Sequence, residues 1–231
     1  MEKKVLIIIP SYNEEENVVR VFETCQQKNE YHYLFINDGS TDKTGQLLDQ
    51  HSIPHVDLVQ NLGIGGAVQT GYKYAYEHDF DIAVQFDGDG QHDINYVKNI
   101  IDPILRDEAD FVIGSRFIQE MEGNFQSSGA RRMGIKLISF FIRLMTKVKV
   151  YDTTSGFRAV NKKIIKEFAN NYPSEYPEPI TTTRMLKKGY RLKEVPVLMH
   201  ERQGGTSSIG SWKNVYYMIN VILNILLVDG R

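Results

Sequence analysis

The first 90 residues alternate between short apolar runs and polar loops that lead into amphipathic stretches. The run at 4–9 is rich in β-branched residues, as is typical of a strand that is buried on both faces. Further strand-like runs lie at 33–36, 56–59 and 81–86, and helix-like stretches lie at 44–50 and 68–78. Repeated strand, loop and helix units predict an α/β domain with a mainly parallel, Rossmann-like central sheet flanked by helices.

Polar loops follow directly after these predicted strands, at Pro10, Asp38, Asn61 and Asp87. In a parallel sheet the ligand binds beyond the carboxyl ends of the strands. We therefore expect these four loops to converge on one site.

The segment Asp87-Gly88-Asp89 places two carboxylates two residues apart at the end of a predicted buried strand. Carboxylate oxygens suit Mg²⁺ or Mn²⁺, and Mg²⁺ is typically held by one or two carboxylates together with substrate phosphates. This pattern indicates a metal site that binds a nucleotide diphosphate. A plain turn between two elements is the alternative, because Asp and Gly are common turn residues.

Four motifs, in this order and spacing, resemble the nucleotide-sugar half of family 2 glycosyltransferases with the GT-A fold: PSYNEE at 10–15, NDGSTD at 37–42, NLGIGG at 61–66 and DGDGQH at 87–92. GSRF at 114–117 and DTTSGFR at 152–158 resemble the branch that contains dolichyl-phosphate mannose synthases and polyprenyl-phosphate glycosyltransferases. The resemblance covers about residues 4–210.

The resemblance implies a donor site and a metal site. Its predicted donor-binding residues are Pro10, Tyr12, Glu14, Asp38, Gly65, Asp87, Asp89 and Arg202, the last in a segment that closes over the diphosphate. Asp38 would hydrogen-bond the base or the ribose, and uridine is the expected base. Asp87, Asp89 and Gln91 would hold Mg²⁺ or Mn²⁺. We interpret His92 as a surface residue at a helix entry.

The resemblance also implies an acceptor site with catalytic residues Asp152, Asp89 and Arg116. Its predicted phosphate-binding residues are Arg116, Arg131, Arg132 and Arg158, since guanidinium groups bind phosphate in a bidentate manner. Asp152 is the candidate base or acceptor-positioning carboxylate. A phosphate monoester is largely dianionic at neutral pH, so Asp152 could instead orient Arg158 or the sugar. Glu178 is a second carboxylate that could act as base.

Two segments indicate contact with a membrane. Residues 131–150 contain six basic residues, no acidic residue and many apolar ones, which suits a helix in the headgroup plane of an anionic bilayer; a buried core helix with a basic edge is the alternative. The apolar stretch 215–228 has 14 residues, short of the ~20 needed to cross a bilayer. It would be an interfacial anchor, a contact with a membrane partner or a core helix.

Composition sets wider limits. The 231 residues are 42% hydrophobic and 24% charged, as in an ordinary globular protein, and the net charge of −2 argues against a nucleic-acid binder. Cys25 is the single cysteine and no secretory signal precedes the first strand, so we expect a cytosolic compartment. We predict one domain, 1–231, with a donor half at 1–90, an acceptor half at 91–210 and an apolar, membrane-proximal helix at 211–231.

These features predict a metal-dependent, inverting glycosyltransferase that moves a sugar from a nucleotide diphosphate, a UDP-sugar by expectation, to polyprenyl phosphate. It would act at the cytoplasmic membrane face, with a small membrane-protein subunit or a second copy as further partners. Transfer to a hydroxyl of a glycan or a lipid-linked saccharide is an alternative. Two others are a catalytically idle nucleotide-sugar-binding subunit and a dinucleotide-binding oxidoreductase, suggested by the glycines at 63–66.

Overall fold

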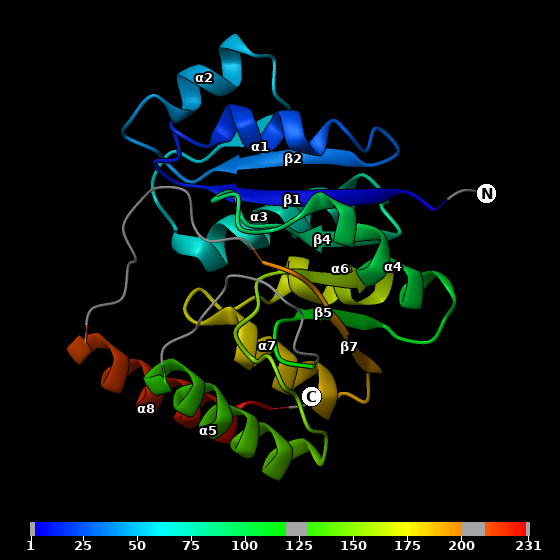
Figure 1. Ribbon diagram of the computed structural model, residues 1–231, viewed down its shortest axis with the longest axis vertical. Coiled ribbons are helices and arrows are strands. Elements are labelled where there is room, and N and C mark those ends of the chain that lie inside the picture. The colour runs from blue at the N-terminus through cyan, green and yellow to red at the C-terminus, as the bar shows by residue number, and fades with distance from the viewer. Residues whose placement is uncertain (1–2, 119–128, 200–210, 230–231) are drawn as a thin grey trace.

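The computed structural model describes residues 3–118, 129–199 and 211–229 of the chain (Figure 1). One seven-stranded sheet runs through it in the order β3-β2-β1-β4-β6-β5-β7. Its strands are β1 (Val5–Ser11), β2 (His32–Asn37), β3 (His55–Asp57), β4 (Ile82–Gln85), β5 (Phe111–Ser115), β6 (Arg158–Asn161) and β7 (Leu192–Pro196). The predicted α/β fold with a mainly parallel sheet is confirmed.

Strand β6 departs from the parallel pattern, because it pairs antiparallel with both β4 and β5. Its first residue, Arg158, lies opposite Gln85, the last residue of β4. The loop at 152–157 therefore enters the sheet at the same edge at which β4 ends. The reversed strand brings a distant segment of the sequence to the ends of the parallel strands.

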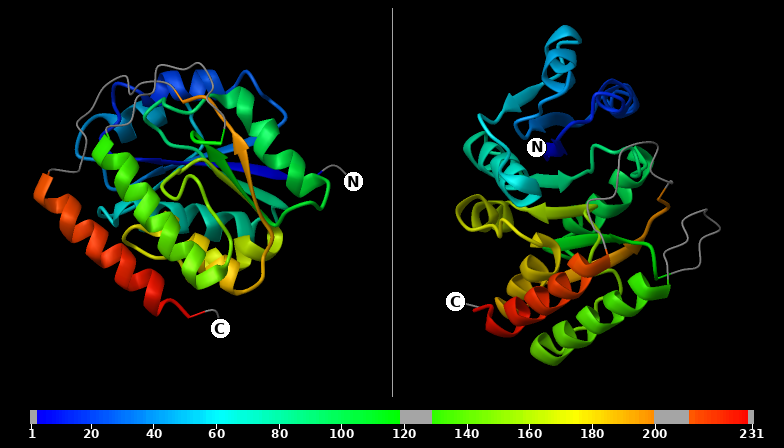
Figure 2. Two further views of the ribbon diagram at one scale, coloured as in Figure 1. Left: turned by 60° about the horizontal axis from the view of Figure 1, so that its bottom comes forward. Right: turned by 90° about the vertical axis from the view of Figure 1, so that its left-hand side faces the viewer.

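Helices cover both faces of the sheet (Figure 2). They are α1 (Val18–Cys25), α2 (Thr44–Gln50), α3 (Gly63–Glu77), the 3₁₀ turn η1 (Ile94–Tyr96), α4 (Val97–Leu105), α5 (Gly129–Thr146), α6 (Lys162–Asn170), α7 (Pro177–Lys187) and α8 (Ser211–Leu227). Side chains of β1 alternate between the two cores, as expected for a central strand: Leu6 and Ile8 pack with α3, α6 and α7, whereas Ile7 and Ile9 pack with α1 and α4.

Helices α5 and α8 contact each other and α7, and they form the outermost layer on one side of the molecule (Figures 1 and 2). Both helices contribute buried residues to the core, among them Ile138, Ile142 and Val221. The segment 131–150 therefore buries one face in the core and exposes the other, so the core interpretation accounts for only one of its faces. Within the described ranges, no helix has the length and apolarity that crossing a bilayer requires.

Candidate functional site

The loops that follow β1, β2 and β4 contact one another at the carboxyl edge of the sheet, as the sequence predicts. The Asp38 N–H donates a hydrogen bond to the Ser11 carbonyl over 2.9 Å. Gly88 lies so close to β1 that a β-carbon there would be 2.9 Å from the Pro10 carbonyl oxygen. Three of the predicted motifs thus meet within one small region.

Residues of the first motif hold the second motif in place. The Asn13 backbone has φ of 54°, and its side-chain oxygen accepts from the Thr41 N–H over 2.8 Å. The Glu14 N–H donates to Thr44 Oγ1 over 2.8 Å, and the Glu14 carboxylate accepts from Asn17. The Tyr12 side chain is 46% exposed. Its predicted contact with the donor stays a prediction.

Asp38, in the second motif, is buried against the third motif. Its Oδ1 accepts from the Leu62 N–H over 2.7 Å. Burial raises the pKa of this carboxyl, and the backbone amides of Leu62 and Gly63 partly oppose the shift. The next residue, Gly39, has φ of +65°, and a β-carbon there would lie 2.6 Å from the backbone of Asn61. Asp38 therefore fixes the loop at 60–63, and its predicted contact with base or ribose stays a prediction.

The predicted metal-binding segment forms a tight turn directly after β4. Gly90 has φ of +74°, and Asp89 Oδ1 accepts from the Gln91 N–H over 3.0 Å. Asp87 packs against Gly156, where a β-carbon would lie 2.8 Å from both carboxylate oxygens. Among the described residues no group of three or more His, Cys, Asp or Glu side chains could hold a metal ion by itself. Two carboxylates and an amide oxygen match the incomplete donor set of an ion that also binds diphosphate.

His92 is a core residue, and its interpretation as a surface residue is wrong. Its ring stacks on Phe157 with centroids 4.8 Å apart and meets the Phe86 ring edge-on at 5.3 Å. Its Nδ1 accepts from the Asp87 N–H over 3.0 Å, and its Nε2 lies 3.4 Å from Asp87 Oδ2. A neutral ring with its proton on Nε2 satisfies both contacts. His92 thus supports the turn that carries Asp87.

Burial lowers the pKa of His92 to about 4. The unfolded chain binds a proton on this ring below about pH 6.5, whereas the folded protein resists it until about pH 4. The stabilisation is therefore complete above pH 6.5 and decreases as the pH falls, by up to about 3 kcal/mol. We expect His92→Gln to flatten the fall in unfolding free energy between pH 7 and 5, measured by urea unfolding of metal-free protein. The exposed His51→Gln control should keep the wild-type slope; equal slopes in all three proteins would contradict this assignment.

Arg116 and Asp152 form a buried bidentate pair. Arg116 Nε donates to Asp152 Oδ2 and Nη2 donates to Oδ1, each over 2.7 Å, and the Arg116 N–H adds a 3.1 Å bond to Oδ2. Asp152 is 0% exposed. Arg116 Nη2 also donates to Thr154 Oγ1 over 3.1 Å. This carboxylate is thus engaged in fixing the guanidinium of Arg116, which disfavours Asp152 as a base.

Glu194 is a site residue that the sequence analysis missed. Its two carboxylate oxygens accept from the Tyr151 and Asp152 N–H groups, each over 2.8 Å. Burial raises the pKa of Glu194, and these two bonds oppose the shift. Glu194 on β7 therefore braces the loop that carries Asp152. Its place in the chain, more than 40 residues from its partners, leaves no local signal in the sequence.

Arg158 lies inside the protein and does not reach a ligand surface. Its guanidinium donates to the carbonyls of Ser155, Glu178 and Thr153. A further bond reaches Thr182 Oγ1 over 3.0 Å. The expectation that Arg158 binds the acceptor phosphate is therefore wrong, as is the suggestion that Asp152 orients it. Arg158 connects the 153–155 loop to the first turns of α7.

Glu178 lies in the first turn of α7. Burial raises the pKa of this carboxyl, the charge of Arg158 opposes the shift, and the charge of Asp87 adds to it. A carboxyl with a raised pKa next to the predicted metal-binding segment has the property of a candidate general base.

The remaining predicted residues are less informative. A β-carbon on Gly65 would lie 2.2 Å from the Pro173 carbonyl oxygen, so close packing of α3 against the loop between α6 and α7 explains this glycine without a ligand. Arg132 is exposed near the start of α5. The Arg131 side chain and Arg202 lie outside the described residues.

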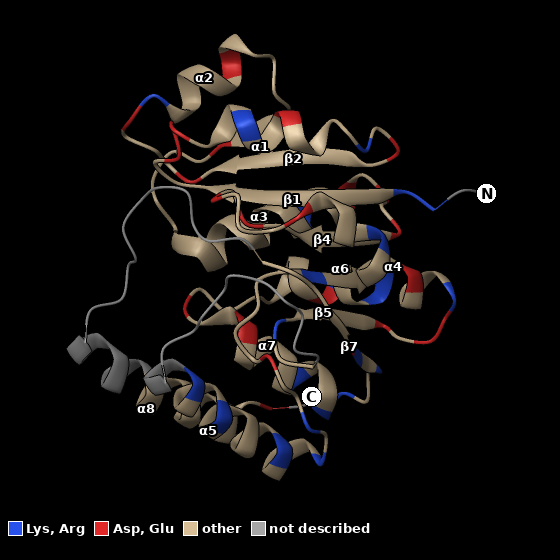
Figure 3. Ribbon diagram, viewed as in Figure 1, with Lys and Arg blue, Asp and Glu red and all other residues tan. Residues whose placement is uncertain are grey.

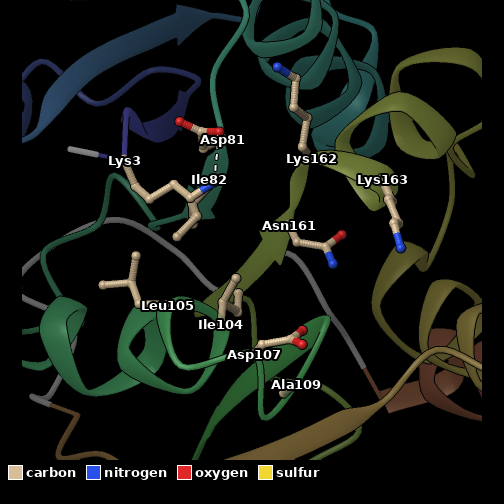
Figure 4. Close-up of a pocket in the computed structure, with 10 residues that line it drawn as sticks. All are labelled: Lys3, Asp81, Ile82, Ile104, Leu105, Asp107, Ala109, Asn161, Lys162 and Lys163. Carbon is tan, nitrogen blue, oxygen red and sulfur yellow. Dashed lines mark hydrogen bonds and ion pairs between the residues drawn. The ribbon is translucent and has the colours of Figure 1, made fainter. Parts of the chain in front are cut away.

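A cavity of about 190 Å³ lies away from these motifs (Figure 4). Its lining includes Lys3 and Asp81, which precede β1 and β4 and form an ion pair of 3.2 Å. It thus opens near the amino ends of the strands, opposite the motif loops. None of the predicted site residues lines it.

Comparison with known proteins agrees with this geometry. Residues 6–168 match the family described as Glycosyl transferase family 2. The chain is 31% identical to the UDP-N-acetylglucosamine–dolichyl-phosphate N-acetylglucosaminyltransferase of Methanococcus voltae, in an alignment that covers 85% of each protein. It is 29% identical to the polyprenol monophosphomannose synthase of Mycolicibacterium smegmatis, covering 90% of this chain and 81% of the relative.

Two solved structures share the fold. Glucosyl-3-phosphoglycerate synthase from Mycobacterium tuberculosis, in complex with Mn²⁺, UDP and glucosyl-3-phosphoglycerate, superposes with a TM-score of 0.72 at 15% identity, covering 97% of this chain and 79% of that one. S. aureus TarS 1–349 in complex with UDP-GlcNAc has a TM-score of 0.65 at 18% identity, covering 98% and 67%. The GT-A type of fold is therefore confirmed.

Proposed function

The chain belongs to glycosyl transferase family 2, and we propose that this glycosyltransferase moves a sugar from a nucleoside diphosphate to a polyprenyl phosphate. The observation that carries the proposal is the guanidinium of Arg116, held by Asp152 close to the carboxylate-bearing turn after β4. Arg116 and Asp89 lie near enough to His92 that both charges influence its pKa. A fixed guanidinium beside a turn that would bind a metal ion suits two phosphate-bearing substrates, the nucleoside diphosphate donor and the polyprenyl phosphate acceptor.

The donor would bind at residues 1–90, with its diphosphate at the turn after β4. Asp87, Asp89 and Gln91 would hold Mg²⁺ or Mn²⁺, and this ion would neutralise the diphosphate charge as the leaving group departs. Uridine is the proposed base. The M. voltae relative, whose name specifies a UDP-sugar, supports this choice, as does the fold shared with UDP complexes.

The acceptor would bind beyond residue 91, with its phosphate on Arg116 and on the arginines at the start of α5. A phosphate oxygen of the acceptor would attack the anomeric carbon from the face opposite the diphosphate, so the bond to the diphosphate breaks with inversion. Because a phosphate monoester is mostly dianionic at neutral pH, this step needs no base. A reaction that needs no base agrees with the state of the Asp152 carboxylate, which is fully buried and paired with Arg116. Two relatives whose names specify polyprenyl phosphate products or acceptors support this acceptor class.

Glu178 favours a second candidate function. Transfer to a hydroxyl of a glycan or of a lipid-linked saccharide needs a base, and the raised pKa of Glu178 suits one. In that reaction Glu178 would accept the hydroxyl proton as the oxygen attacks. Glu178→Gln would then abolish transfer, whereas transfer to a phosphate acceptor would continue.

The test is an assay with radiolabelled UDP- and GDP-sugars and short-chain polyprenyl phosphate in detergent, with Mn²⁺, Mg²⁺ or EDTA. We expect a labelled lipid from a UDP-sugar, formed with either ion and lost with EDTA. Equal formation of labelled lipid in EDTA would contradict the metal requirement. Slow hydrolysis of a donor without any labelled lipid would contradict the acceptor class.

The contact of Gly156 with Asp87 gives a prediction about metal affinity. An added β-carbon would lie 2.8 Å from both carboxylate oxygens, so Gly156→Ala must displace Asp87. Disturbing a residue that orients a metal ligand typically weakens metal binding by 10- to 100-fold. We expect a loss of about tenfold or more in Mn²⁺ affinity in the presence of UDP, measured by electron paramagnetic resonance. Gly134→Ala, whose β-carbon would meet Met218 at an ordinary 3.4 Å, should bind Mn²⁺ as the wild type does.

The place of action is part of the proposal. A polyprenyl phosphate stays in the membrane, so the enzyme would work peripherally at the cytoplasmic face. A small membrane subunit or a second copy of the chain would be compatible with this arrangement.

A further inference from the structure

Helix α5 carries an exposed apolar stripe opposite its buried face. Met133, Leu137, Phe140 and Leu144 are exposed and recur at intervals of four, three and four residues. This spacing places them on one side of a helix. Phe140 and Leu144 are 59% and 61% exposed, which is unusual for large apolar side chains in a folded protein.

Helix α8 carries a second stripe of the same kind. Ile219, Leu223, Leu226 and Leu227 are exposed, whereas Val221 and Ile225 are buried in the core. The two helices touch near Gly134, where a β-carbon would lie 3.4 Å from the Met218 sulfur. They lie side by side on the outside of the molecule (Figure 2). The two stripes therefore belong to one outer layer, which we name the α5–α8 surface.

Positive charge borders the apolar stripe of α5 (Figure 3). Exposed basic residues occur here at Arg132, Lys136, Arg143, Lys147 and Lys149. At 3.6 residues per helical turn, one flank of the apolar stripe carries four of these residues: Arg132, Lys136, Arg143 and Lys147. Gly134, which faces α8, lies on the opposite flank, so the basic flank points away from α8. The ranges 129–149 and 211–228 contain no Asp or Glu. An apolar stripe with a cationic flank is the pattern of a helix that lies in the plane of an anionic bilayer.

We propose that the α5–α8 surface docks the enzyme on anionic lipid bilayers, with both apolar stripes at the level of the headgroups and the basic flank on lipid phosphates. The inference rests on the proposed function, which places the acceptor in a membrane. A second copy of the chain fits this surface less well, because neither helix offers an acidic residue to the basic flank. The start of α5 lies on the side of the molecule where β1 ends, so docking brings the site towards the lipid (Figure 1).

The test is flotation of the full chain with vesicles of phosphatidylcholine, with or without 30 mol% phosphatidylglycerol. We expect binding that requires the anionic lipid and weakens as salt is raised, because salt screens surface charge. Phe140→Asp combined with Leu223→Asp should lower the partition coefficient by about tenfold or more. Leu105→Asp on α4 combined with Tyr76→Asp on α3, at 45% and 46% exposure, is the matched control and should bind as the wild type does.

A second pair of variants tests the charged flank. Arg143→Glu combined with Lys147→Glu should weaken binding by about 25-fold, since each basic residue near the surface contributes about fivefold. Lys73→Glu on α3 combined with Lys166→Glu on α6, which changes the net charge by the same amount at two other exposed positions, is the control for net charge. The proposal is overturned if the wild type fails to float with anionic vesicles. It is also overturned if the apolar-to-Asp variant and the basic-to-Glu variant both float as well as the wild type. A dimer that Phe140→Asp dissociates, without vesicle binding, would overturn it in favour of self-association.

Transfer to a short-chain, water-soluble polyprenyl phosphate without vesicles separates this inference from the proposed function. None of the substituted residues belongs to the proposed site, so the docking variants should keep wild-type transfer in that assay. Loss of vesicle binding with intact soluble transfer supports the docking surface. Wild-type transfer in solution without vesicle binding overturns the docking surface alone, whereas vesicle binding without any transfer overturns the proposed function alone.

Discussion

Asp89→Asn should reduce sugar transfer by about a thousandfold or more. The substitution removes one of two carboxylates in the proposed metal site and keeps the size of the side chain. A bound ion contributes several kcal/mol to stabilising the charge of the leaving diphosphate, and about 4 kcal/mol corresponds to a factor of about 1,000 in rate. Because Asp89 Oδ1 accepts from the Gln91 N–H, and an Asn oxygen can accept the same bond, the turn itself should persist. The measurements are kcat/KM and Mn²⁺ binding in the presence of UDP.

Asp93→Asn is the matched control for this substitution. Asp93 is four residues away, and its side chain caps the turn η1 by accepting from the Asn95 N–H over 2.9 Å. Asn caps helices about as well as Asp, so activity and stability should both stay close to wild type. If Asp89→Asn bound Mn²⁺ normally and retained activity, the turn after β4 would be a structural turn and not a metal site.

Asp152→Asn should lower stability and activity together. Asp152 accepts three hydrogen bonds from Arg116, and removing its charge leaves a nearly buried guanidinium without its counter-ion. Breaking a buried pair in this way costs about 3–5 kcal/mol. We expect a loss of this size in the free energy of unfolding, together with a higher KM for the acceptor phosphate because Arg116 is no longer fixed.

The pH profile of kcat separates a positioning role from a basic one. If Asp152 holds Arg116, residual activity of Asp152→Asn should keep the wild-type pH dependence, and Arg116→Lys should raise the acceptor KM in a similar way. If Asp152 is the base, the fall in kcat at low pH should disappear in Asp152→Asn, while the free energy of unfolding stays unchanged. Arg191→Lys is a control, because Arg191 forms an exposed pair with Asp110 whose loss should cost about 1 kcal/mol or less.

The donor edge of the fold was predictable because its signals are local. Each of the strands β1, β2 and β4 is a short apolar run, and its functional loop follows directly in the sequence. The helix expected at 44–50 is α2. The meeting of the Pro10, Asp38 and Asp87 loops follows from the parallel pairing of β1 with β2 and β4.

The errors concern contacts between residues that are far apart in the sequence. His92 looked like a surface residue because the ring that covers it, Phe157, is 65 positions away. Arg158 looked like a phosphate ligand because its carbonyl partners include Glu178, which only the antiparallel β6 brings near. Glu194 gave no signal, since its partners are backbone amides of a distant loop. Sequence patterns show which residues can do chemistry, whereas burial decides which of them support the site from within.

The most direct test of the account compares two acceptors of equal chain length, a polyprenyl phosphate and the corresponding polyprenol. Each is incubated with wild type and with Glu178→Gln, using the donor that supports transfer. The account predicts transfer to the phosphate by both proteins and none to the alcohol. Transfer to the alcohol by wild type, lost in Glu178→Gln, would contradict it and establish a hydroxyl acceptor with Glu178 as the base.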